Sequence, residues 1–224
     1  MPQTKKYFIF DLDGTLYKYD KELSSSFEKS QFRQDLRNRA ITFLSQIANL
    51  DTLDAKNEYE KLKLEFNGDF SLAMETKYDI PKKESISFIW KISPNRYVKP
   101  NPQLVTELGK LKGRIALVTG SPNAWAIPTL RHLKIDKFFD PAIYTYDYYL
   151  KKPDPSIFAH VADKFKTDPS NIISIGDNFD SDLAPAKRIG MKTMLISDSK
   201  QLTDADMQAT NILEAIQALN LIST

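Results

Sequence analysis

Two patterns of hydrophobic positions alternate along the chain. Short apolar runs bounded by turn or polar residues are typical of buried strands, and each is followed by a helical pattern or a long insert. Strands that alternate with helices in this way predict a largely parallel sheet. These runs cover residues 7–10, 115–118, 172–175 and 193–196.

The span 20–97 has a different texture. It contains no convincing strand, and it is rich in Leu, Phe, Lys and Glu. Turn-forming residues at 67–69 and 79–81 divide it into several helices, and the prolines in 99–102 mark the return to the sheet. Its apolar residues recur at helical spacing in Leu36, Ala40, Phe43 and Ile47, and again in Tyr59, Leu62 and Phe66.

We therefore predict an α/β protein with a doubly wound, mostly parallel Rossmann-like sheet. A core domain is expected from residues 1–19 and 98–224, and a helical domain from residues 20–97 is inserted in it. A chain of 224 residues is long enough for one domain that carries a smaller inserted one.

Composition narrows the class of protein. The 31 Lys and Arg nearly balance the 29 Asp and Glu, and the signs are mixed, so a nucleic-acid polymer or a membrane surface is not an expected partner. The absence of Cys excludes disulfides, thiolate metal sites and a Cys nucleophile, and fits a reducing compartment. The first apolar run is too short for a signal or membrane segment, so we expect a cytoplasmic protein. Its oligomeric state, monomer or dimer, stays open.

Candidate chemistry begins directly after the first apolar run. Asp11 and Asp13 follow it, with Gly14 and Thr15 behind them. The strand is expected to deliver these acids to its carboxyl end, where open α/β sheets bind ligands. Carboxylates at i and i+2 can share a hard divalent cation, or one can attack an electrophile while the other handles a proton.

Three later stretches lie at or near other strand ends. Thr119 and Gly120 precede a predicted helix, where a hydroxyl and backbone N–H groups suit an anion, although Thr is often only a cap there. Lys152, before a proline, can offer a charge to phosphate, although a basic turn is often only solvated. Asp177, Asp180 and Asp182 crowd one loop, which costs repulsion unless a cation or Lys offsets it.

Taken together, these stretches resemble the four motifs of the haloacid dehalogenase-like superfamily, in order and in spacing. The resemblance covers about residues 5–17 and 98–200. It implies an aspartyl nucleophile at Asp11 and a general acid/base at Asp13. It also implies a phosphate-binding Thr119 with Gly120, and a cationic Lys152.

The same resemblance implies a Mg²⁺ site. Asp11, Asp177 and the backbone carbonyl of Asp13 would hold the ion, while Asp182 would orient metal-bound water or Lys152. Lys151 could compete with Lys152, which we prefer because it stands directly before Pro153. We give Asp180 a lesser chance of a direct role than Asp182.

An acid at position 13 resembles the phosphatases and mutases of this superfamily, which implies a small phosphate monoester as substrate. The helical insertion is similar to the cap of the phosphoglycolate phosphatase, β-phosphoglucomutase and pyrimidine 5′-nucleotidase group. Such a cap closes over the site and selects the leaving group. Phosphoglycolate, sugar phosphates and a phosphoglucomutase-type transfer therefore stay open as alternatives.

A looser similarity favours the pyrimidine 5′-nucleotidase branch. It rests on Leu16 and Tyr17, on the stretch from Gly68 to Pro100, and on positions between Ala126 and Asp140. Departures at Gly14 and Gly120 weaken it. Some aromatic residues could stack on a base but more often belong to a core, and two histidines lie away from every motif. The aromatic residues are Tyr17, Phe66, Phe70 and Trp90, and the histidines are His132 and His160.

Two other classes of protein share part of this pattern. A receiver-type phospho-acceptor module uses similar Asp, Thr, Lys and Mg²⁺ chemistry, but it places its metal acids first and has no helical insertion of this size. A non-catalytic phosphate-binding protein could keep the fold, but every expected catalytic residue is present here. The sequence therefore favours a Mg²⁺-dependent phosphatase.

Overall fold

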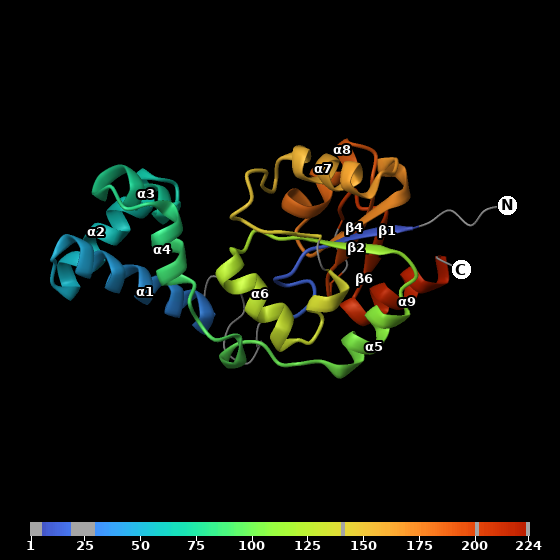
Figure 1. The fold of residues 1–224 in the computed structure, drawn as a ribbon, viewed down its shortest axis with the longest axis horizontal. Coiled ribbons are helices and arrows are strands. Elements are labelled where there is room, and N and C mark those ends of the chain that lie inside the picture. The colour runs from blue at the N-terminus through green and yellow to red at the C-terminus, as the bar shows by residue number, and fades with distance from the viewer. Residues whose placement is uncertain (1–5, 19–29, 140–141, 200–201, 223–224) are drawn as a thin grey trace. The chain divides into compact units, whose positions relative to one another are not determined.

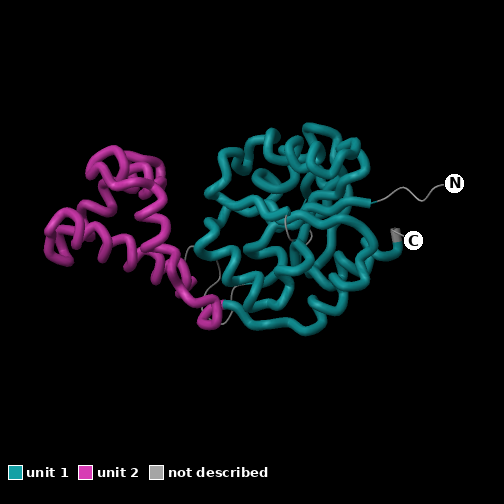
Figure 2. The backbone as a smooth tube through the Cα atoms, in the orientation of Figure 1, with its two compact units in different colours: residues 1–19, 98–224 teal, residues 20–97 magenta. Residues whose placement is uncertain are grey.

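The structure is a computed structural model that describes residues 6–18, 30–139, 142–199 and 202–222. The chain divides into two compact units, one from residues 1–19 and 98–224 and the other from residues 20–97 (Figure 2). Within the described residues, no helix has both the length and the apolar character needed to cross a bilayer.

The first unit is built on a six-stranded sheet with the order β3-β2-β1-β4-β5-β6, in which every pairing is parallel. This confirms the predicted α/β class. The strands are β1 (Tyr7–Phe10), β2 (Arg114–Val118), β3 (Ile143–Tyr144), β4 (Ile172–Gly176), β5 (Lys192–Ile196) and β6 (Met207–Ala209).

Helices cover both faces of this sheet. Figure 1 shows α7 and α8 on one face, and α5, α6 and α9 on the other. Their bounds are α5 (Pro102–Lys110), α6 (Asn123–His132), α7 (Pro155–Phe165), α8 (Ala184–Arg188) and α9 (Ile212–Ile222). Short turns complete the unit: η3 (Asp136–Phe138), η4 (Pro169–Asn171) and the π-helical η5 (Phe179–Leu183).

The central strand β1 is buried on both sides. Tyr7 and Ile9 pack in one core cluster with Phe158 and Phe165 of α7, while Phe10 meets Phe139 edge to face with ring centroids 6.3 Å apart. Successive side chains of a strand point to opposite faces, so a strand covered on both faces must be apolar throughout. The burial of β1 therefore explains the continuous apolar run that precedes Asp11.

The second unit is helical. Ser30, Asp51 and Asp69 cap three of its helices by accepting hydrogen bonds from backbone N–H groups of the first turn. Its elements are α1 (Gln31–Ala48), α2 (Thr52–Glu65), α3 (Phe70–Tyr78), α4 (Lys82–Ile89) and the short turn η2 (Pro94–Arg96).

The predicted apolar stripe of α1 is correct except at its end. Leu36, Ala40 and Phe43 are buried, but Ile47 is 37% exposed. Ile47 lies in the last turn, beside the left-handed Asn49 that ends the helix, where less of the helix is covered. The breaks expected at 67–69 and 79–81 separate α2 from α3 and α3 from α4.

Candidate active site

The candidate site lies where three neighbouring parallel strands end. β1 lies between β2 and β4, so the residues that follow these strands meet at one edge of the sheet. The backbone N–H of Asp11 donates to the Ile175 carbonyl at 2.9 Å, and that of Thr119 donates to the Tyr144 carbonyl at 2.9 Å. The sheet's hydrogen-bond pattern therefore continues into Asp11 and Thr119, which fixes their backbones.

Lys152 joins two of the buried acids. Its Nζ lies 2.6 Å from Oδ1 of Asp11 and 2.6 Å from Oδ1 of Asp182. The three side chains are only 7%, 8% and 4% exposed, in the order Lys152, Asp11 and Asp182. Nearby Asp154 accepts a hydrogen bond from the Ser156 backbone and caps α7, so the motif also sets where that helix begins. Lys152 thus partly offsets the crowding of acids.

Asp177 stands beside the Asp11 carboxylate. Thr15 Oγ1 donates to Asp11 Oδ2 at 3.0 Å and lies 3.4 Å from Asp177 Oδ1. Gly14 has a φ of +88°, and a Cβ built there would lie 2.1 Å from Asp177 Oδ2. Only glycine allows both this backbone conformation and this close approach. Gly14 therefore leaves room for the Asp177 carboxylate.

The electrostatics of the acids follow from this crowding. Burial raises the pKa of Asp11 well above its usual value, and Asp182, Asp177 and Asp13 add to this while Lys152 opposes it. The pKa of Asp177 is raised to about 6, first by loss of solvent around its carboxylate and then by the charge of Asp182. The residue as a whole is nevertheless exposed. Burial lowers the pKa of Lys152, but Asp11 and Asp182 outweigh it and raise that pKa above its usual value.

Asp182 is held by the loop that carries it. Ser181 Oγ donates to Asp182 Oδ1 at 2.8 Å, and the Asn178 N–H donates to Asp182 Oδ2 at 3.1 Å. The backbone is fixed as well, because Ser174 Oγ in β4 donates to the Asp182 carbonyl at 2.9 Å. Both carboxylate oxygens of Asp182 are therefore already bonded within the protein.

Asp13 has its own set of partners. Ser121 Oγ donates to Asp13 Oδ2 at 2.6 Å, and Thr119 Oγ1 lies 3.4 Å from the same oxygen. The indole Nε1 of Trp125 donates to Asp13 Oδ1 at 2.8 Å, and the Tyr17 hydroxyl donates to that oxygen too. The two acids of the first motif therefore contact separate groups of side chains.

The residue set suits a hard divalent cation. One carboxylate oxygen each from Asp11, Asp177 and Asp182 lie within 4.8 Å of one another, and carboxylates are the ligands that Mg²⁺ and Ca²⁺ prefer. Asp11 and Asp182 both already accept hydrogen bonds from Lys152, so an ion held by these acids would compete with that lysine. The space that Gly14 leaves beside Asp177 fits the interpretation as a cation site.

The remaining candidates lie outside this cluster of contacts. Gly120 is exposed, and no atom lies within 4 Å of the position its Cβ would take. Asp180 is exposed, while Lys151 lies over the Tyr146 ring, 4.0 Å from its centroid. His132 Nε2 is 2.8 Å from the Val98 carbonyl, and His160 Nε2 is 2.9 Å from the Tyr148 hydroxyl.

Three of the four aromatic residues that could stack on a base have protein partners. Phe70 packs against Tyr59 with ring centroids 5.4 Å apart, and Trp90 packs against Phe32 at 6.0 Å. Tyr17 is buried and hydrogen-bonded to Asp13. These contacts favour the core interpretation of the three residues.

Sequence reasoning did not single out Ser121 or Trp125 as partners of Asp13. Ser121 lies in the predicted anion-binding stretch, and its position two residues after Thr119 was a usable signal. Trp125 gave none, because an aromatic residue in the first turn of an amphipathic helix is usually a core residue. Only the fold brings its N–H to Asp13.

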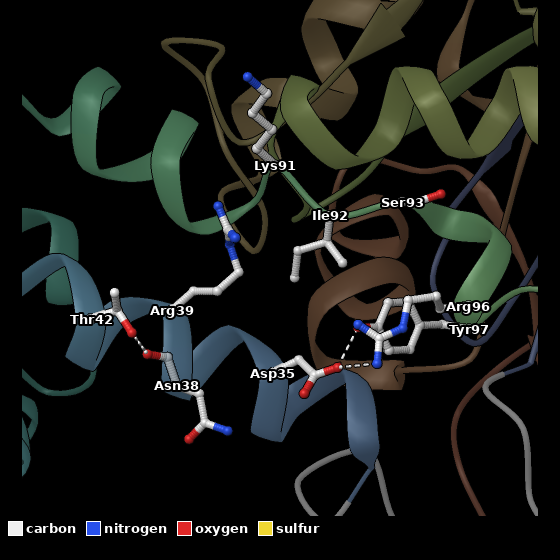
Figure 3. Close-up of a pocket in the computed structure, with 9 residues that line it drawn as sticks. All are labelled: Asp35, Asn38, Arg39, Thr42, Lys91, Ile92, Ser93, Arg96 and Tyr97. Atoms are coloured by element: carbon white, nitrogen blue, oxygen red, sulfur yellow. Dashed lines mark hydrogen bonds and ion pairs between the residues drawn. The ribbon is translucent and has the colours of Figure 1, made fainter.

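The helical unit holds a polar pocket of its own, with a volume of about 340 Å³ (Figure 3). Asp35 is its acidic residue. The Tyr97 hydroxyl donates to Asp35, and Arg96 Nη2 lies 3.5 Å from the same carboxylate. Arg39 donates to the Phe88 and Ile89 carbonyls at the end of α4. The lining residues are Asp35, Asn38, Arg39, Thr42, Lys91, Ile92, Ser93, Arg96 and Tyr97.

The chain was compared with protein-family models and with curated proteins. A family model described as haloacid dehalogenase-like hydrolase matches residues 5–190. A search of curated proteins gave no match.

Several solved structures are similar along their whole length. A HAD phosphatase from Thermococcus onnurineus has a TM-score of 0.67 at 20% identity, covering 96% of this chain and 97% of that one. A Bacillus subtilis HAD-hydrolase bound to magnesium has a TM-score of 0.58 at 17% identity, with 96% and 99% covered. A 2-haloacid dehalogenase from Pseudomonas syringae has a TM-score of 0.56 at 17% identity, with 99% and 100% covered. At these identities the similarity concerns the fold.

Proposed function

Because this chain belongs to the haloacid dehalogenase-like hydrolases, we propose that it is a Mg²⁺-dependent phosphatase of small phosphate monoesters. The observation that carries this proposal is Asp13, a second carboxylate two residues after Asp11. Its Oδ2 bonds to Ser121 and lies near Thr119, two hydroxyls that follow the neighbouring strand. A second acid in this position supplies the proton transfer that ester hydrolysis requires.

In the proposed reaction Asp11 attacks phosphorus, and the bond from phosphorus to the alcohol oxygen breaks as the aspartyl-phosphate forms. Asp13 gives its proton to the departing alcohol. It then takes a proton from a water molecule, whose oxygen bonds to phosphorus as the bond to Asp11 breaks. Hydrolysis thus returns Asp11 and Asp13 to their starting states.

The other residues would stabilise charge and fix position. Lys152 would contact a phosphate oxygen while it holds Asp11, and Thr119 with the Gly120 backbone would contact another. A Mg²⁺ ion held by Asp11, Asp177 and the Asp13 carbonyl would neutralise phosphoryl charge. Asp182 would orient Lys152, to which it is hydrogen-bonded at 2.6 Å.

The proposed substrates are small monoesters, with pyrimidine nucleoside 5′-monophosphates as the first class to assay. Sugar phosphates, phosphoglycolate and a phosphoglucomutase-type transfer are the alternatives within the same chemistry. We propose that residues 20–97 act as the cap that selects among them.

The test is release of phosphate from p-nitrophenyl phosphate, UMP, CMP, sugar phosphates and phosphoglycolate, with Mg²⁺ and then with a chelator. A parallel assay measures halide release from 2-haloacids, the reaction of the dehalogenases in this family. We expect Mg²⁺-dependent phosphate release and no halide release. Halide release without phosphate release overturns the proposal, and UMP no better than sugar phosphates overturns the nucleotide preference alone.

Asp11→Asn is the decisive variant, because an amide cannot attack phosphorus, and we expect at least a ~10³-fold loss of kcat. Asp180→Asn is the matched control, since Asp180 is an exposed acid in the loop that carries Asp177. Its activity should stay within about twofold of the unaltered protein. Full activity of Asp11→Asn excludes Asp11 as the nucleophile.

A further inference from the structure

The two oxygens of the Asp13 carboxylate have different surroundings. Oδ2 is contacted by the hydroxyls of Ser121 and Thr119, which belong to the strand-end loop proposed to bind phosphate. Oδ1 is contacted by two aromatic side chains, Tyr17 and Trp125, which have no place in the reaction proposed above. The carboxylate is therefore held from one side by aromatic donors.

The two aromatic donors come from separate parts of the first unit. Tyr17 lies four residues after Asp13, and an isolated parallel bridge pairs the two residues. Trp125 lies in the first turn of α6, and its Nε1 is also 3.2 Å from the Tyr17 hydroxyl. Tyr17 is 6% exposed and Trp125 is fully buried at 0%. Bulk water therefore cannot readily replace these two donors.

We infer that Tyr17 and Trp125 are positioning residues that hold Asp13 by Oδ1 and leave Oδ2 to transfer the proton. The inference rests on the proposed phosphatase function. An indole N–H donates and cannot accept, so Oδ1 stays an acceptor throughout the reaction. The proton that Asp13 gives to the alcohol, and later takes from water, is therefore exchanged at Oδ2.

The Ser121 hydroxyl can follow this exchange. A hydroxyl both donates and accepts, so Ser121 Oγ, 2.6 Å away, can donate to Oδ2 when it is bare and accept when it carries the proton. Trp125 offers no such choice on the other side. The arrangement keeps one oxygen fixed and the other adaptable, which is what a group that is first an acid and then a base needs.

A simpler interpretation is that both aromatic residues only fill the core. The dependence of kcat/KM on the leaving group distinguishes this interpretation from the positioning role. A misplaced general acid lowers the rate most when the departing oxygen is strongly basic. Phenyl phosphate has the more basic leaving group, and p-nitrophenyl phosphate needs little protonation. kcat/KM for both esters, with Mg²⁺ present, reports the step in which the alcohol departs.

Tyr17→Phe removes the hydroxyl and keeps the ring. We expect kcat/KM to fall roughly tenfold for phenyl phosphate and less than about twofold for p-nitrophenyl phosphate. Tyr7→Phe is the matched control, a buried tyrosine at the start of β1, and should change neither value by more than about twofold. Equal losses for both esters in Tyr17→Phe overturn the inference while the phosphatase function stands. An unaltered protein that releases phosphate neither from these esters nor from the other monoesters named above overturns both.

A second measurement needs no activity. The chain contains two tryptophans, so a ¹⁵N-labelled sample gives two indole N–H signals, and Trp125→Phe identifies which is which. Asp13→Asn should move the Trp125 signal, because its hydrogen bond then goes to a neutral amide, and should leave that of Trp90 in place. A Trp125 signal that does not move in Asp13→Asn overturns the inference.

Discussion

Among the described residues, a cluster at the strand ends and a cluster in the helical unit each combine a carboxylate with a cation and a hydroxyl, and they differ in burial. At the strand ends, the Asp11 and Lys152 side chains are 8% and 7% exposed, and their charged atoms are 2.6 Å apart. In the helical unit, Asp35 and Arg96 are 19% and 66% exposed and 3.5 Å apart. Thr15 donates to Asp11, and Tyr97 donates to Asp35.

The difference in burial indicates which cluster is costly. Burying several like charges carries a large desolvation penalty, which a lysine offsets only in part, so the raised pKa of Asp11 marks a strained set of charges. A partly exposed pair such as Asp35 and Arg96 is screened by solvent, so it costs less and contributes less. Perturbed groups of the first kind gather at functional sites, whereas the second kind is common on ordinary surfaces.

The strongest challenge to this comparison is Lys152→Met, which leaves Asp11 and Asp182 without their cation. We expect kcat/KM for p-nitrophenyl phosphate to fall about 10²–10³-fold, because the variant lacks the positive charge that stabilises the phosphoryl group. Unfolding in denaturant should show a loss of about 3–5 kcal/mol in chelator, the usual effect of breaking a buried pair.

Lys151→Met is the matched control for that variant. Lys151 is exposed and its ammonium lies over the Tyr146 ring, so we expect less than about 1 kcal/mol of destabilisation and near-normal activity. A greater loss of activity in Lys151→Met than in Lys152→Met would show that the two lysines have been assigned in the wrong order.

Asp11→Asn should change the free energy of unfolding less than Lys152→Met does. The folded protein holds a proton on Asp11 more tightly than the unfolded chain, whose value is near 3.8, so stability falls as pH rises from 3.8 through the raised pKa. In chelator at pH 7 the variant should therefore be more stable than the unaltered protein and unfold at a higher Tm.

Two controls sharpen that result. The gain in Tm should shrink as the pH falls and disappear about a unit below 3.8, where Asp11 is protonated in both states. Saturating Mg²⁺ should reverse the order, because an ion bound to Asp11 stabilises the unaltered protein. A Tm of Asp11→Asn below that of the unaltered protein in chelator at pH 7 contradicts the strain described above.

The smallest effect belongs to Asp35→Asn. Asn keeps one oxygen that can accept from Gln31 Nε2, which donates to Oδ1 at 2.9 Å, and its NH2 can donate to the Tyr97 hydroxyl on the other side. The substitution otherwise loses only a partly exposed ion pair. We expect a loss of at most about 1 kcal/mol in thermal unfolding, equal with and without Mg²⁺. A change in Tm that depends on Mg²⁺ would remove the contrast between the two clusters.

Much of the fold could be predicted from the sequence because its signals are local. Four short, mostly apolar runs mark buried strands, and each prediction is correct to within one residue at either end. β3 (Ile143–Tyr144) and β6 (Met207–Ala209) were missed. Edge strands of two and three residues are too short to show a periodic pattern.

The candidate site was predictable for the same reason, but only in part. Asp11, Thr119 and Asp177 each follow a strand, and parallel strands bring such residues to one edge. The roles given to them stay predictions. The bonds from Trp125 to Asp13, and from Ser181 and Asn178 to Asp182, depend on the paths of α6 and η5, which no local pattern specifies.

By itself the sequence determined that the protein has parallel strands ending in acids, because period and composition act over a few residues. The tertiary structure alone decided how the two acids of the first motif differ. Asp11 meets Lys152 and Thr15, whereas Asp13 meets Trp125, Tyr17 and Ser121. The chemistry of a carboxylate depends on its burial and its donors, and segments more than 100 residues away supply several of these.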